Sequence, residues 1–157
     1  MKSVLCDINF FLDIFLKREP FYAPAAIVFN MIEEKKLKGY ICALSFPTLY
    51  YLLSKELKQE RAIKILEKVR IVFHVAAVDE RVVDLSLTSS SRDFEDAVQY
   101  YSAVQAKSER LITRNKSDFK VDALSSPQRN FRQLKSADKY PISRFFKCFQ
   151  LTSPSKK

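Results

Sequence analysis

Four aspartates lie at spacings that a parallel α/β sheet could bring together, and such residues could bind a divalent metal ion. They are Asp7, Asp93, Asp96 and Asp118. Carboxylate oxygens are the hard ligands that Mg²⁺ and Mn²⁺ prefer, and Mg²⁺ usually takes one or two of them while keeping waters and substrate phosphates. These residue types therefore predict a metal-dependent phosphodiesterase.

Short apolar segments alternate with longer helical ones along the chain, and this alternation predicts how the aspartates are positioned. The pattern is typical of parallel strands joined by right-handed crossovers, with helices on both faces. We predict a three-layer α/β/α sandwich with a central parallel sheet of about five strands. The expected strands cover residues 3–6, 40–43, 72–75, 111–113 and 123–124, and the expected helices cover residues 23–37, 45–55, 59–69, 79–87, 93–106 and 127–134, with a further helix or turn after residue 9.

Particular residues predict the ends of these elements. We expect Gly39 to be the C-cap of the first long helical segment, Ser45 to be the N-cap of the next, and Asp79 to cap a later helix. Asp7 and Asn115 immediately follow expected strands. Because ligands of open parallel sheets collect beyond the carboxyl ends of the strands, these two positions support the metal-site hypothesis.

Length and composition exclude several classes of protein. The chain has 157 residues, 47% of them hydrophobic, which predicts one domain with a substantial core. Its single glycine, Gly39, excludes both a P-loop and a Rossmann glycine fingerprint. The three cysteines, Cys6, Cys42 and Cys148, lack metal-binding spacing. We therefore expect reduced, buried thiols and a cytoplasmic protein. Acidic residues interrupt the first apolar stretch, so neither a signal peptide nor a membrane span is expected.

The basic charge lies mainly at the end of the chain. The net charge of the whole chain is +9, of which residues 1–127 contribute +2 (19 basic minus 17 acidic) and residues 128–157 contribute +7 (8 basic minus 1 acidic). Since the last expected helix ends near residue 134, we divide the chain into a domain at residues 1–134 and a basic, aromatic extension at residues 135–157. The extension could follow an RNA backbone, dock on the domain or a second subunit, or be a solvated tail.

Three segments resemble a known family. The sequences DINFFLD, DFEDAVQYYSA and LITRNKSDF resemble the successive acidic motifs of PIN-domain proteins, which include the VapC-like ribonuclease toxins of bacterial toxin–antitoxin pairs. The resemblance runs from residue 1 to about residue 134. It implies an α/β/α sandwich, a carboxylate cluster that binds Mg²⁺ or Mn²⁺, and hydrolysis of RNA phosphodiester bonds. It also implies an antitoxin partner and a homodimer.

Carried over by position, the resemblance assigns roles to several residues. Asp7 is the first metal ligand, Asp96 is the third acidic residue, and Asp118 contributes to the fourth acidic position. Asn115 stands where many members have Asp; its carbonyl can ligate a metal or orient a water, but it supplies no negative charge. Polar residues that would orient the acidic cluster through hydrogen bonds are Asn9 and Thr113.

One position departs from the family pattern. The second acidic residue normally lies about five positions after the residue that corresponds to Ser45, and Tyr50 occupies that place. A phenol is neutral at pH 7 and is a poor ligand for Mg²⁺. We expect Asp93 to replace the missing acid, because it lies three residues before Asp96 and shares its helix face, whereas Glu95 points elsewhere in a regular first turn. Alternatively, Asp93 is simply the N-cap of its helix.

Other residues have both a functional and a structural interpretation. Arg114 and Lys116 could contact the substrate phosphate or could be solvated loop residues. Asp118 could be an ordinary turn residue. Asp13 could lie near the rim of the site or pair with Lys17, four residues further along a helix.

Some aromatic residues are more simply explained by packing. His74 stands alone in an apolar segment, so we expect a packed or hydrogen-bonded core histidine. The tyrosine pairs at 50–51 and 100–101 are expected to belong to the core.

The sequence thus predicts a metal-dependent endoribonuclease, the toxin of a toxin–antitoxin pair. In this prediction Asp7, Asp93, Asp96, Asn115 and Asp118 are the candidate catalytic residues. The substitutions at two acidic positions leave open a weakly active or inactive PIN-like module that binds RNA or a protein partner. A third alternative is a structural domain whose basic tail recognises an acidic protein.

Overall fold

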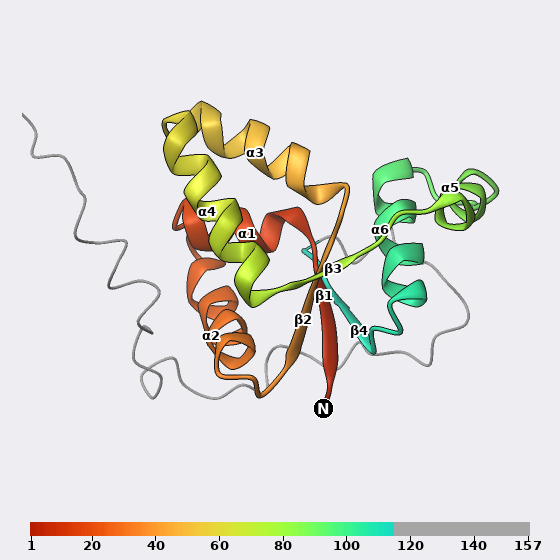
Figure 1. Ribbon diagram of the computed structural model, residues 1–157, viewed down its shortest axis with the longest axis horizontal. Helices are drawn as coiled ribbons and strands as arrows, with labels where there is room; N and C mark the ends of the chain where they lie inside the picture. The colour runs from red at the N-terminus through yellow and green to blue at the C-terminus, as the bar shows by residue number, and fades with distance from the viewer. Residues whose placement is uncertain (115–157) are drawn as a thin grey trace, which may run out of the picture.

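The computed structural model describes residues 1–114 of the chain, and these residues form a four-stranded parallel sheet covered by helices on both faces (Figure 1). The strand order is β3-β2-β1-β4, and every neighbouring pair is parallel. The strands are β1 (Ser3–Cys6), β2 (Lys38–Cys42), β3 (His74–Ala76) and β4 (Arg110–Ile112). All four strands therefore end at the same edge of the sheet.

Two groups of helices cover the two faces of the sheet. Figure 1 shows α1 to α4 on one side and α5 and α6 on the other. The helices are α1 (Ile8–Phe15), α2 (Tyr22–Glu33), α3 (Ser45–Glu56), α4 (Gln59–Val72), α5 (Glu80–Leu87) and α6 (Phe94–Gln105). The predicted α/β/α sandwich is confirmed. The predicted fifth strand at 123–124 and the predicted helix at 127–134 lie outside the described residues, as does the whole 135–157 extension.

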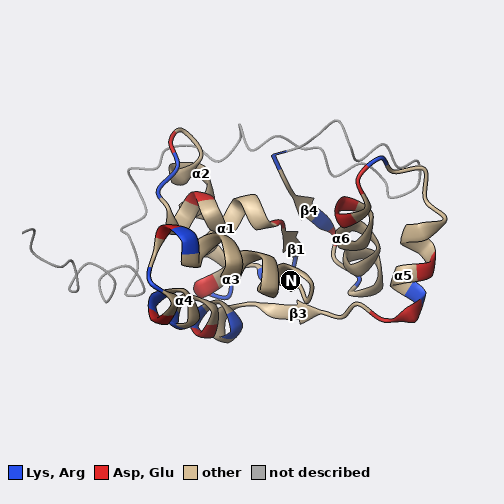
Figure 2. Ribbon diagram, turned by 90° about the horizontal axis from the view of Figure 1, so that it is seen from above, with Lys and Arg blue, Asp and Glu red and all other residues tan. Residues whose placement is uncertain are grey.

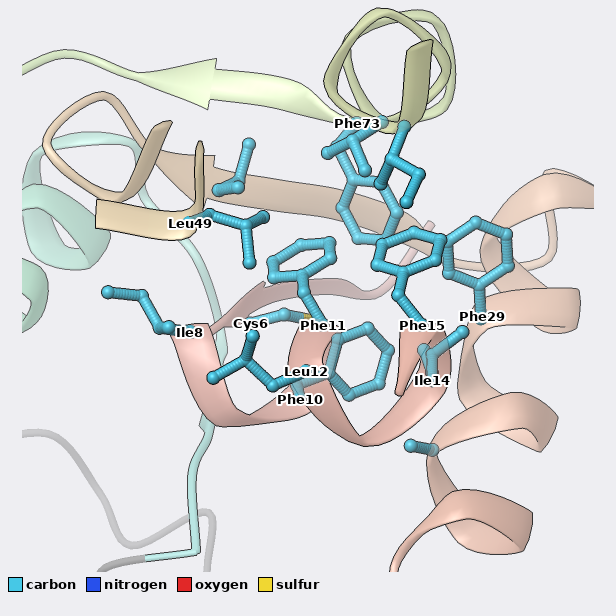
Figure 3. Packing of buried hydrophobic residues seen from close by; sticks show 14 of the residues in the cluster. Cys6, Ile8, Phe10, Phe11, Leu12, Ile14, Phe15, Phe29, Leu49 and Phe73 are labelled. Carbon is cyan, nitrogen blue, oxygen red and sulfur yellow. The ribbon is translucent and has the colours of Figure 1, made fainter. Parts of the chain in front are cut away.

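The larger part of the described core lies under α1 to α4. Its centre is a group of phenylalanines in edge-to-face contact, with ring centroids 5.2 Å apart for Phe10 and Phe11 and 5.0 Å apart for Phe11 and Phe73 (Figure 3). The ring of Phe29 also contacts Phe73, with their centroids 5.5 Å apart. Edge-to-face pairs contribute about 0.5–1.5 kcal/mol beyond the area they bury. This packing holds α1, the helix that follows Asp7, firmly against the sheet.

Gly39 has a different role from the one predicted. It is not a helix C-cap, because α2 already ends at Glu33 and Gly39 lies within β2. A Cβ atom at this position would lie 2.6 Å from Cγ2 of Ile32 and 2.8 Å from the ring of Phe73. Glycine is therefore needed here because α2 and the end of α4 approach the β2 backbone closely.

The ends of two further elements differ from prediction. Ser45 is the first residue of α3 and Leu44 is its N-cap, so the expected hydroxyl cap is not formed. Helix α4 continues to Val72, so β3 begins at His74. The prediction that His74 is a core residue is wrong, because β3 is an edge strand and His74 is exposed there, beside the ring of Tyr40.

Two other predictions are confirmed. Asp79 caps α5, because its carboxylate accepts a hydrogen bond from the N–H of Val82 at 3.0 Å. Cys6 and Cys42 are buried, free thiols. Among the described helices, none is both long enough and apolar enough to cross a membrane.

Candidate active site

Asp7 lies at the carboxyl end of the central strand β1 and also begins α1. Its backbone is extended, and its Oδ1 accepts a hydrogen bond from the N–H of Phe10 at 2.9 Å, which makes it the N-cap of the helix. Its own N–H donates to the carbonyl of Ile112 in the neighbouring β4 at 3.0 Å. Only 6% of Asp7 is exposed. Sheet and helix together therefore hold this carboxylate in one place.

The surroundings of Asp7 act on its pKa in opposite directions. Burial is the largest influence and raises the pKa, because it disfavours the charged form. Hydrogen bonds from the Thr113 side chain and from the backbone N–H groups of Phe10 and Arg114 lower the pKa, as does the positive charge of Arg114. The net shift is upward. Thr113 thus contacts Asp7, and its predicted role in orienting the acidic cluster stays a prediction.

The first turn of α6 supplies the other acidic residues of the site, and acidic positions on this helix are red in Figure 2. Asp93 is the N-cap, and its Oδ1 accepts hydrogen bonds from the N–H groups of Glu95 at 2.9 Å and Asp96 at 3.2 Å. Asp93 is exposed, and Asp96 is half-buried. The alternative interpretation of Asp93 as a helix cap is therefore confirmed.

Glu95 is the acidic residue that the sequence prediction set aside in favour of Asp93. Burial raises the pKa of the half-buried Glu95 carboxyl, and the negative charges of Asp93 and Asp7 raise it further. Glu95 therefore lies within electrostatic range of Asp7, although a regular first turn was expected to direct it elsewhere. The sequence held one signal for it, since Glu95 is an acid beside Asp96 in the first turn of the same helix.

The described carboxylates supply oxygen ligands of the kind that a hard divalent cation prefers. Asp7 is a buried carboxylate, and the effect of its charge on Glu95 shows two anionic groups near one another. A bound cation would relieve this repulsion. Within residues 1–114, no group of three or more His, Cys, Asp or Glu side chains is placed to hold a metal ion. The candidate residues Asn115, Lys116 and Asp118 lie outside that range.

Tyr50 occupies an apolar environment. It is half-buried and packs against the large core cluster under α3. The position that is acidic in other members of the resembled family is thus part of the hydrophobic packing here. The neighbouring Tyr51 is exposed, contrary to the prediction, and the Lys55 ammonium lies 4.0 Å from its ring centroid.

Arg114 makes contacts that the sequence did not predict. Its Nε donates a hydrogen bond to Oδ2 of Asp13 at 2.8 Å, and its Nη2 pairs with Oδ1 of the same carboxylate. The pair between Asp13 and Lys17, one of the two interpretations of Asp13, is not formed; helix α1 ends at Phe15, and Lys17 has a left-handed backbone with φ 51°. Asn9 lies half-buried in the first turn of α1, where its predicted orienting role stays a prediction.

Comparison with known proteins establishes the family. The PIN domain family matches residues 3–117, and the chain therefore belongs to this family. No curated protein sequence matches the chain.

Solved structures share the fold at low sequence identity. The chain is similar to the Mycobacterium tuberculosis VapC20, a toxin that cleaves the sarcin–ricin loop, with a TM-score of 0.60 and 11% identity, over 73% of this chain and 92% of that one. It is also similar to VapBC2 from Rickettsia felis, in a complex with a DNA fragment from its promoter. That similarity has a TM-score of 0.56 and 15% identity, over 75% of this chain and 91% of the other.

Proposed function

We propose that this PIN-domain protein is a metal-dependent endoribonuclease and the toxin of a toxin–antitoxin pair. The observation that carries the proposal is the placement of Asp7. Its carboxylate is buried at the carboxyl end of the central strand, oriented by hydrogen bonds, and close enough to Glu95 for the two charges to interact. Its cap of α1 and its hydrogen bonds offset only part of the cost of burying this charge, and a bound cation would offset the rest.

Different residues of the chain would have separate roles in hydrolysis. Asp7 and Asp96 would hold Mg²⁺ or Mn²⁺ together with Asp118, as the resemblance implies, and the Glu95 carboxylate would add negative charge beside them. When bound, such an ion lowers the pKa of a coordinated water and stabilises negative charge on the leaving oxygen. Thr113 and the Arg114 N–H would keep Asp7 in a single orientation. Asn115 would orient a water, and Lys116 would contact the phosphate.

The rest of the proposal concerns partners. RNA is the proposed substrate, supported by the likeness in fold to a toxin that cleaves an RNA loop. The likeness to VapBC2 supports an antitoxin as a protein partner. A homodimer is proposed by analogy with the family alone, and a cytoplasmic location is proposed from the buried, free thiols of Cys6 and Cys42.

A specific observation favours a second candidate function. Tyr50 packs into the core in place of an acidic residue, so the site has one carboxylate fewer than the family pattern. A non-catalytic PIN module that binds RNA or a protein partner would tolerate this loss, whereas a nuclease must compensate for it. Glu95 is the residue placed to do so.

A cleavage assay separates these two functions. The full chain is incubated with Mn²⁺ and either single-stranded RNA or an RNA hairpin with the sequence of the sarcin–ricin loop, and Asp7→Asn combined with Asp96→Asn serves as the impaired variant. We expect cleavage by the wild type that needs Mn²⁺ and disappears in the double variant. Glu56→Gln, at the exposed end of α3, is the matched control and should cleave normally. A wild type without metal-dependent cleavage would reject the nuclease, and RNA binding retained by the double variant would then support the module.

A further inference from the structure

Asp13 is a buried acid in the second half of α1 that the proposed chemistry does not use. Only 3% of it is exposed. Both of its oxygens face Arg114, a residue 101 positions later, through the Nε hydrogen bond at 2.8 Å and the Nη2 ion pair. This two-point contact matches the planar fork of a guanidinium to a carboxylate, so it defines the orientation of Arg114 as well as its position.

A second group contacts the same guanidinium. Its central carbon lies 4.0 Å from the ring centroid of Phe21, the residue that immediately precedes α2. The guanidinium lies over the Phe21 ring, while its Nε and Nη2 contact Asp13. The Arg114 side chain is therefore held between α1 and the turn that connects α1 to α2.

The backbone of Arg114 also contacts the candidate active site. Its N–H donates to Asp7, and the side chain of the preceding residue, Thr113, hydrogen-bonds to the same carboxylate. Residues 113 and 114 thus contact α1 at two places, its N-cap Asp7 and the internal Asp13. The position of the chain after β4 relative to Asp7 depends on both contacts.

We propose that Asp13 is a positioning residue of the active site, which holds the Arg114 guanidinium and so keeps Thr113 and the Arg114 N–H in hydrogen-bond contact with Asp7. A contribution to stability alone is a weaker explanation, because burying an ion pair usually costs about as much as its attraction returns. The expected effect of Asp13 on catalysis rests on the proposed function, whereas its expected effect on the position of Arg114 does not.

The structural effect is measured by amide hydrogen exchange of the full chain, using NMR and the variant Asp13→Asn. We expect exchange of the Arg114 N–H to become about tenfold faster or more, the order expected for losing a hydrogen bond to a charged group. Amides in the middle of α1, such as that of Phe11, should keep their rates. Glu34→Gln removes the exposed pair with Lys36 and is the matched control, with no change expected. An unchanged Arg114 rate in folded Asp13→Asn would overturn the proposal.

A second variant covers the case in which Asp13→Asn does not fold. Arg114→Lys keeps a positive charge opposite Asp13 but removes the planar fork. It should also accelerate exchange of the amide at position 114, and the same unchanged rate would overturn the proposal.

Kinetics distinguish positioning from direct contact with RNA. If the wild type cleaves RNA, Asp13→Asn should lower kcat by roughly 10- to 100-fold with little change in KM, as is typical for residues that orient metal ligands. Arg114→Gln should have a similar effect, and the double variant should lose no more than either single variant. Losses that multiply in the double variant, with a raised KM for Arg114→Gln, would overturn the proposal in favour of phosphate binding by Arg114. If the wild type does not cleave RNA, the proposed function fails and the exchange rates alone decide the role of Asp13.

Discussion

The starts of α1 and α5 use the same local structure and differ in their surroundings. In both, an aspartate with an extended backbone caps the helix by accepting a hydrogen bond from the N–H three residues later, at 2.9 Å for Asp7 and 3.0 Å for Asp79. Asp7 is buried and its pKa is raised, whereas Asp79 is exposed and its pKa is lowered. Capping alone therefore does not mark a functional aspartate. The difference lies in what tertiary packing places around the carboxylate.

The helices that follow the two caps differ in the same way. Seven of the eight residues of α1 are buried, and Figure 3 shows its side chains packed among those of other helices. Helix α5 buries only Val82 and Ser86, and it leaves Val83, Leu85 and Leu87 exposed. A rigid α1 keeps Asp7 in place, and α5 has no such requirement.

The largest expected effect tests this contrast in packing. Leu12→Ala, in α1, should lower the free energy of unfolding by about 2–5 kcal/mol, because it leaves a cavity in the core. Leu87→Ala makes the same chemical change at an exposed position of α5 and should alter stability by no more than about 0.5 kcal/mol. Urea denaturation of both variants provides the measurement. Equal losses would mean that α5 is as well packed as α1.

The next effect compares the two caps directly. Asp7→Asn should reduce Mn²⁺-dependent cleavage by more than about 100-fold, beyond the 10- to 100-fold typical of residues that only orient a ligand. Asp79→Asn should leave cleavage unchanged, since asparagine caps helices as well as aspartate does. Single-turnover kinetics with one RNA substrate give both values. Similar activities for the two variants would remove the proposed difference between the caps.

A smaller effect extends the comparison to the third cap, at α6. Glu95→Gln should reduce cleavage by roughly 10- to 100-fold, the range found when a group around a metal site is changed. Asp93→Asn should have little effect, because it preserves the cap and changes only an exposed charge. Binding of Mn²⁺, measured by calorimetry, should weaken in the first variant only. The reverse order would restore Asp93 as the replacement acid.

The smallest effect concerns the pH dependence of stability without divalent metal. Because burial raises the folded pKa of Asp7, the native state binds more protons than the unfolded state between the two pKa values, and stability falls as pH rises through that interval. Asp7→Asn should therefore be more stable than the wild type at neutral pH, and this difference should vanish in acid, below about pH 3.9.

Asp79 should behave in the opposite way. The hydrogen bond from the Val82 N–H is the main cause of its lowered pKa, so its ionised form adds stability that is lost as pH falls through the folded pKa. Asp79→Asn should be less stable than the wild type at neutral pH and should match it in acid. Urea midpoints measured across pH for both variants test the signs. The same sign for both would contradict the assigned environments.

Local patterns were enough to predict most of the described fold. The apolar run before Asp7, the cap at Asp79 and the alternation of short and long segments each depend on residues close in sequence, and the structure confirms them. Predictions that depended on distant residues were less successful. Gly39 is required by the approach of Ile32 and Phe73, and the exposure of His74 follows from the position of β3 at the sheet edge.

For the candidate site, too, local properties could be predicted from the sequence and long-range contacts could not. By itself the sequence determined which residues could carry charge and which of them follow a strand or cap a helix, because these properties depend on residue type and near neighbours. Only the tertiary structure decided that Glu95 lies within range of Asp7, that Tyr50 joins the core, and that Arg114 binds Asp13. The physical reason is that burial and charge interactions depend on distance in space, and the folded sheet brings together segments that are far apart along the chain.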